Sequence, residues 1–276
     1  MIKFFRRIRQ NLIMDLPSRQ AGNKTGKPAW PVGRYLKYAI GEIILVMIGI
    51  LLALQVNNWN EGRKDRIKEQ VVLKQLQEDY QANLMQLEEK MTTRDGIIYS
   101  AMKLLKAFDH PAGIIRDSLV KELANAFHDP TYDPIQNDLT SSNNLILIRN
   151  HKLKRLLSNW SSDVVGVREI EVTWSTTVNG EFDLILSELG LGRDVSNSFM
   201  NNSQHLWLLD HNEESYKIEI GTSKLGAPLN EILTSRKLEG MLGSAITLNK
   251  AANLQSEALR LRILKILDLI KSELVK

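Results

Sequence analysis

The chain has 276 residues and no cysteine, which excludes a framework of disulfide bonds. Its 36 Lys and Arg against 32 Asp and Glu give a formal net charge of +4, but the surplus of bases is confined to the first 37 residues. Residues 57–276 hold 27 bases and 30 acids, and their net charge of −3 argues against nucleic acid as a partner.

Residues 1–37 are predicted to form a basic cytoplasmic tail and linker, with nine Lys or Arg and one acid, Asp15. Within residues 2–13 the apolar side chains Ile2, Phe5, Ile8 and Leu12 recur every three or four positions among bases. This pattern favours a short amphipathic helix on the inner leaflet, or else a disordered basic tail that only sets the topology. The prolines and glycines of residues 15–33 predict a flexible linker.

Residues 38–56 are predicted to be a transmembrane helix. No polar side chain lies between Ile43 and Leu54, and the whole run is just long enough to cross the hydrocarbon core of a bilayer. The alternative is a buried core helix. The flanking aromatic residues Tyr35, Tyr38 and Trp59 favour the membrane, since such rings prefer the headgroup level.

The excess of bases before this segment predicts that the N-terminus is cytoplasmic and that residues 57–276 lie outside the cytoplasm. We expect no cleaved signal peptide, because the apolar run comes late and no Ala-x-Ala follows it.

One face of the apolar segment collects its small residues and its acid. At 100° per residue, this face comprises Gly41, Glu42, Leu45, Gly49, Leu52, Ala53 and Val56. Small residues let helices approach closely, and an acid inside a membrane normally faces protein. The face is therefore a candidate helix–helix contact, for a homo-oligomer or a partner. Alternatively, Glu42 snorkels to the interface or is protonated.

The remaining residues predict an all-α domain. Apolar residues from Leu73 to Met91 recur every three or four positions, and no proline interrupts residues 61–108, which predicts one long membrane-proximal helix on the order of 70 Å. His110 to Gly113 end it. The further helices expected are 114–127, 135–142, 151–190 with Asn150 as its cap, 228–238 and 241–275, with a loop at 129–134 and an irregular polar segment at 193–227.

The last helix is apolar on more than one side. Its main stripe is Leu259, Ile263, Ile266, Ile270 and Leu274, widened by Leu261, Leu264 and Leu267. Such a helix is either the central helix of the bundle or meets a second subunit, so the stripe is a candidate association surface. The overall expectation is one transmembrane helix followed by an elongated helical bundle with coiled-coil character.

Two stretches of the chain, Tyr38–Ile43 and Ile48–Glu61, form a recognisable pattern. They resemble an uncharacterised bacterial family of short membrane-anchored proteins, a domain of unknown function common in Bacteroidetes-type genomes. The start, Met1–Gln10, and the mid-chain stretches Leu139–Asn143 and Leu156–Trp160 are similar too, with Asn143 where the family has Gly. The resemblance implies a Gram-negative inner membrane and a periplasmic domain. It carries no known activity, so no catalytic residue is transferred.

No motif for catalysis, metal or cofactor stands out. The residues His205, Asp210, His211, Glu213 and Glu214 lie close together in sequence but lack metal-site spacing. Loop carboxylates Asp129, Asp133 and Asp138 lack the calcium-binding loop pattern. We therefore expect solvated loop residues, no cofactor and no enzyme.

Two functions remain. The first is an interaction or scaffold protein of the envelope, expected to be a homo-oligomer. The alternative is a periplasmic ligand sensor that signals through a membrane partner.

Overall fold

The computed structural model describes residues 32–135, 144–202 and 218–274, and every regular element in these ranges is a helix. The all-α prediction is therefore confirmed, including the long apolar helix that comes first. The chain divides into two compact units, residues 1–60 and 61–276. The predictions for the tail, for most of the linker and for the helix at 135–142 fall outside the described residues, apart from Ile135, which is not helical.

The first helix, α2 (Val32–Asp109), carries both the apolar segment and the long helix predicted after it. Between residues 61 and 109 there is no proline, so nothing removes a backbone N–H from the ladder of hydrogen bonds. The helix ends just before His110, as predicted, and a short 3₁₀ turn, η1 (Pro111–Gly113), follows.

The apolar segment of α2 is exposed. Its large side chains from Ile40 to Val56 all lie on the surface, with Leu45 44% and Val56 66% exposed. A core helix would be buried, whereas none of the most apolar stretch of this helix is. Among the described residues the chain thus has one helix long and apolar enough to cross a membrane, which supports a membrane anchor over a buried core helix.

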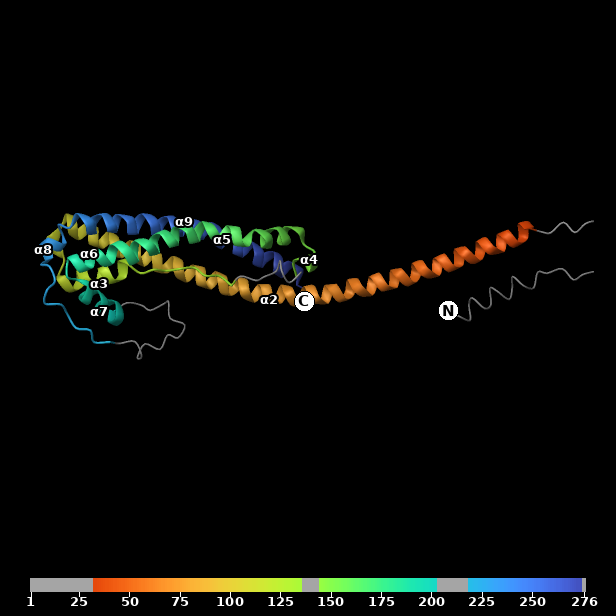
Figure 1. Ribbon diagram of the computed structural model, residues 1–276, viewed down its shortest axis with the longest axis horizontal. Helices are drawn as coiled ribbons and strands as arrows, with labels where there is room; N and C mark the ends of the chain where they lie inside the picture. Colours follow the sequence, from red (N-terminus) through yellow and green to blue (C-terminus); the bar gives the residue numbers. More distant parts are fainter. Residues whose placement is uncertain (1–31, 136–143, 203–217, 275–276) are drawn as a thin grey trace, which may run out of the picture. The chain divides into compact units, whose positions relative to one another are not determined.

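Residues 61–276 form a bundle around three long helices: the second part of α2, α5 (His151–Thr177) and α9 (Arg236–Glu273) (Figure 1). The side chain of Asn150 caps α5 as predicted, because its Oδ1 accepts the backbone N–H groups of Lys152 and Leu153. A π-helical turn, η2 (Val178–Phe182), continues α5 into α6 (Asp183–Glu188). The predicted helix 151–190 is confirmed with this one irregularity.

Two predictions near the chain's last third are wrong. Within the supposedly irregular segment 193–227 the structure has a helix, α7 (Gly192–Asn202), which buries Val195 and Ser198 on one face. The segment has few apolar residues, so its sequence shows only a weak helical pattern. One face of the helix is buried because it packs against α3 (Arg116–Ala126).

The helix predicted at 228–238 is only the short α8 (Leu229–Ile232). The last helix, α9, starts at Arg236, five residues earlier than expected. Its start is fixed by Ser235, whose Oγ accepts the N–H of Leu238.

Two apolar clusters follow one another along the bundle. We call the end that holds Glu61 the base of the bundle. The base cluster includes Leu73, Leu87 and Ile263, and the far cluster includes Leu104, Leu119 and Leu242. Trp160 lies in the base cluster and Trp174 in the far cluster, and both are buried, so both face the core.

The candidate association stripe lies inside the base cluster. Leu259, Ile263, Ile266 and Ile270 are at most 3% exposed, and Leu274 is partly buried against them. The sequence allowed two roles for this stripe, a contact inside the bundle or a contact with a second subunit. In the structure the stripe lies inside the bundle, and α9 is a central helix. The stripe packs on α2 and α5, so it offers no free area to a second copy of the folded bundle.

Ile263→Ala should therefore lower the free energy of unfolding by about 2–5 kcal/mol, because it leaves a cavity at a fully buried site. Leu261→Ala, two residues away on the exposed side of α9, should change it by less than about 0.5 kcal/mol. Urea unfolding of the full chain in mild detergent measures both. Equal effects, or a midpoint of Ile263→Ala that recovers with protein concentration, would place the stripe at an interface between subunits.

Candidate functional site: a polar clasp at the base of the bundle

A buried carboxylate organises the base of the bundle. Glu69 is fully buried on α2, four residues and about one helical turn before Leu73. Its Oε2 lies 2.7 Å from Nη1 of Arg66 and 3.5 Å from Nε of Arg149, while its Oε1 accepts the backbone N–H of Arg149 at 2.8 Å. Two guanidinium groups and one N–H thus satisfy a charge that would otherwise be costly to bury.

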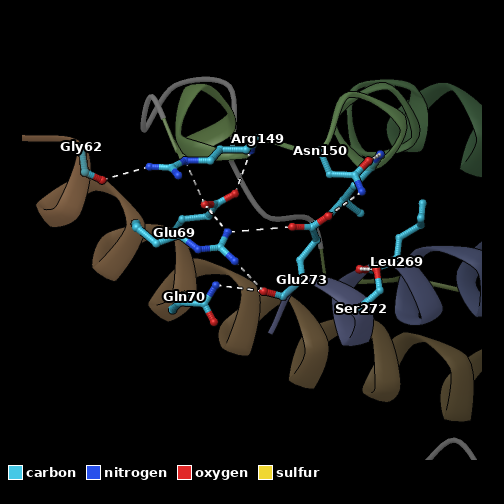
Figure 2. Close-up of polar contacts among 10 residues, drawn as sticks. Gly62, Glu69, Gln70, Arg149, Asn150, Leu269, Ser272 and Glu273 are labelled. Carbon is cyan, nitrogen blue, oxygen red and sulfur yellow. Dashed lines mark hydrogen bonds and ion pairs between the residues drawn. The ribbon is translucent and has the colours of Figure 1, made fainter. Parts of the chain in front are cut away.

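The C-terminal end of α9 is held at the same place (Figure 2). The backbone carbonyl of Glu273 accepts hydrogen bonds from Nη2 of Arg66 at 3.0 Å and from Nε2 of Gln70 at 3.1 Å. The carboxylate of Glu273 accepts Nδ2 of Asn150 at 2.8 Å. These bonds occupy a carbonyl that a helix end leaves without an intrahelical partner.

One further bond closes the arrangement. Nη2 of Arg149 donates to the carbonyl oxygen of Gly62 at 2.9 Å (Figure 2). We call the set Arg66, Glu69, Gln70, Arg149, Asn150 and Glu273 the basal clasp. It joins the start of the bundle part of α2, the residues before α5 and the end of α9, which are up to 207 residues apart in sequence.

The clasp was not predicted, although the sequence contains a signal for it. Arg66, Glu69, Leu73 and Leu76 follow one another at helical spacing, so Glu69 occupies a position that the pattern assigns to the core. An acid at such a position needs basic partners, and Arg66 and Arg149 supply them.

A second buried charge pair lies between the two apolar clusters. Arg94 of α2 is 1% exposed and pairs with the buried Glu171 of α5. Its Nη1 also donates to Oγ of Ser256 at 2.9 Å and to Oδ1 of Asn253 at 3.3 Å, both on α9. Burial lowers the pKa of Arg94 and raises the pKa of Glu171, and in each case the partner's charge opposes the shift.

The same glutamate holds a non-helical segment in the bundle. Both carboxylate oxygens of Glu171 accept the backbone N–H of Tyr132 at 3.1 Å. Further along, Ile135 exchanges two hydrogen bonds with the side chain of Asn83. Residues 128–135 are not helical, and side chains of α2 and α5 provide partners for several of their backbone groups. Burial also raises the pKa of the Tyr132 hydroxyl.

The residues of the predicted anchor face, Gly41, Glu42, Leu45, Gly49, Leu52 and Ala53, are all exposed on α2. A Cβ built on Gly41 or Gly49 meets no atom within 4 Å. Nothing else in the described chain covers this face, so its role as a contact surface stays a prediction.

The candidate metal residues do not form a site in the described part of the chain. Asp129 accepts Oγ of Ser175 at 2.6 Å, and the N–H of Asp133 donates to Oε1 of Gln86. Among the described residues no three His, Asp or Glu side chains are grouped to hold a metal. The cluster from His205 to Glu214, like Asp138, lies outside the described residues, so the expectation that it is solvated remains untested.

Together these features define an all-α protein in which one helix carries an exposed apolar segment and then forms the wall of a bundle closed at its base. A family of unknown function, DUF6090, matches residues 42–107, which are most of α2. The match includes Glu42, Gly49, Glu69 and Arg94, and it supports the resemblance to an uncharacterised domain. No curated protein and no solved structure gives a match.

Glu69→Gln should destabilise the bundle by about 1–3 kcal/mol, because an amide cannot neutralise two guanidinium groups and its NH₂ adds a buried donor. The matched control is Glu78→Gln, on the exposed side of α2, with an expected change below about 0.5 kcal/mol. Hydrogen exchange should quicken first at Arg149 and in the last turn of α9. Uniform exchange along α9 in both variants would mean that the clasp does not hold that end.

Proposed function

We propose that the protein is a membrane-anchored interaction protein of the bacterial envelope without catalytic activity. The observation that carries the proposal is the exposed apolar segment of α2, followed on the same helix by the buried positions of the bundle. A segment so apolar is favourable in lipid and costly in water. The helix therefore supplies an anchor, and the bundle presents surfaces beside the membrane.

The proposed location is the inner membrane, crossed once, with the N-terminus in the cytoplasm and residues 57–276 in the periplasm. The support is the excess of bases in residues 1–37, which carry nine Lys or Arg and one acid. The resemblance to a Gram-negative membrane-anchored family points the same way.

A reporter enzyme that is active only in the periplasm should be active when fused after Lys276 and silent when inserted near Gly22. Expression of both fusions is checked by immunoblot, so a silent fusion is not confused with an absent one. The opposite pattern of activity would refute the proposed orientation.

Self-association is assigned to the anchor face and not to α9. The stripe of α9 is occupied inside the bundle, which leaves the face of Gly41, Glu42 and Gly49 as the candidate surface. Two glycines allow close approach of a second helix, and Glu42 would then face protein and not lipid.

Gly49→Leu should weaken crosslinking of the full chain in membranes, because a leucine at the centre of the face separates the helices. It should leave the bundle intact, since no atom of the chain lies within 4 Å of the added Cβ. Leu51→Phe, on the opposite side of the helix, is the control and should crosslink like the wild type. If neither change affects the crosslinked dimer, the anchor face is not the contact.

A periplasmic sensor is the second candidate. The continuity of α2 favours it, because one helix joins the buried contacts of Arg94 to the apolar segment. A sensor of this design would signal through a membrane partner at the Glu42 face. Mass spectrometry of crosslinked partners distinguishes the two functions: a kinase or receptor subunit supports the sensor, and structural envelope proteins support the scaffold.

A further inference from the structure

The base of the bundle has a surface that the clasp does not use. Residues 61–68 and 144–155 together hold eight bases and two acids, whereas the residues that follow them, 69–89 and 156–171, hold two bases and eight acids. The positive charge is thus concentrated at the end of the bundle where α2 enters, although residues 57–276 are acidic as a whole.

The outward cations of this end are not committed to strong internal contacts. Arg63, Lys64, Lys152 and Arg155 are exposed. Lys68 is exposed too, and its contact with Asp65, at 3.8 Å, is a surface pair of small energetic weight. Even Arg149, which serves the clasp, keeps 55% of its side chain exposed.

Large apolar side chains are exposed among these bases. Ile67 and Val71 project from one face of α2 and are 59% and 65% exposed. Ile146 of the short helix α4 (Asn144–Leu147) is 72% exposed, while the neighbouring Ile148 is buried in the base cluster. Figure 1 shows α4 at the end of the bundle opposite α8. The clasp bonds of Arg149 to Glu69 and Gly62 fix α4 beside the start of the bundle part of α2.

From these observations we infer that the base of the bundle binds the headgroups of anionic lipids. The surface comprises Arg63, Lys64, Lys68, Lys152 and Arg155 with the apolar residues Ile67, Val71 and Ile146; we call it the basic collar. Bases that surround exposed isoleucines are typical of segments that lie in a membrane interface, where the apolar side chains enter the acyl boundary and the cations meet phosphate.

The charge of the collar and its position in the sequence both favour a lipid as its ligand. The collar begins at Arg63, seven residues after the apolar segment ends at Val56, and seven residues reach at most about 25 Å in any conformation. This places the first cations within reach of the headgroup layer of any membrane that the segment crosses. The inference rests on the proposed anchor, and it adds a second, electrostatic contact with the same bilayer.

The test uses the full chain in lipid nanodiscs. Because the chain has no cysteine, Ile146→Cys provides a single position for a fluorophore, and Lys121→Cys, on α3 at the far end, provides a reference. Lipids with a spin label on the headgroup quench a fluorophore that touches the membrane surface. We expect stronger quenching at position 146 in discs of phosphatidylglycerol than in discs of phosphatidylcholine, and little quenching at position 121 in either.

Two sets of substitutions test whether the quenching depends on the positive charge of the collar. Replacing Lys64, Lys68, Lys152 and Arg155 by Gln should remove the additional quenching at position 146. The matched control replaces three lysines and one arginine elsewhere on the bundle, Lys106, Lys224, Arg236 and Lys250, and should leave it unchanged. Raising the salt from about 0.1 M to about 1 M, which shortens the Debye length from about 10 Å to about 3 Å, should also remove most of it.

The outcomes separate the collar from the anchor. Copurification of the chain with phosphatidylcholine discs needs only the anchor, so its failure would refute the proposed membrane protein. If the chain enters the discs but position 146 is quenched equally in both lipids, or equally in both sets of variants, the collar does not bind anionic lipid. Loss of the quenching on addition of inorganic phosphate at constant ionic strength would assign the surface to a free anion and overturn the lipid proposal.

Discussion

The structure depends on one helix that carries two apolar stretches in succession, each of which is costly to leave in water. Along α2, Leu52 and Val56 are more than half exposed, while Leu73 and Leu76 are almost completely buried. Both stretches are apolar, so the hydrophobic effect requires a cover for each. The bundle covers the second stretch with α5 and α9, and no described residue covers the first. The proposed bilayer would provide the cover that the first stretch lacks.

Buried charges determine how the helices of the bundle fit together. Apolar stripes on α2, α5 and α9 could slide by a turn at modest cost, because leucines and isoleucines tolerate exchange of partners. Glu69 and Arg94 do not tolerate such a shift. If a helix slid by a turn, a buried charge would lose its partner, at a cost of about 3–5 kcal/mol. Glu69 fixes the base, and Arg94 with Glu171 fixes the middle. Their contribution is therefore to the register of the helices more than to the net stability.

The sequence was sufficient for the features that depend on local pattern. The heptad spacing from Leu73 to Met91, the proline after His110 and the cap at Asn150 predicted real helix lengths and ends. Prediction from the sequence failed where the structure of a segment depends on the element that it packs against. Helix α7 has few apolar residues and depends on α3. The stripe of α9 was compatible with a core or an interface, and only the position of α2 and α5 distinguishes them. The pair of Glu69 with Arg149 and the pair of Arg94 with Glu171 join residues 80 and 77 positions apart, which no local pattern shows.

The bases of the collar lie next to the bases of the clasp along α2 and at the start of α5, so many bases gather at one end of an acidic bundle. Arg66 and Arg149 form ion pairs with Glu69, whose carboxylate neutralises part of their positive charge. Lys64, Lys68, Lys152 and Arg155 lie next to them on the same helical turns but face outward. Packing alone would not require the outward set, because the clasp is already satisfied without it. Since exposed like charges repel one another in water, their clustering fits the proposed contact with an anionic lipid surface.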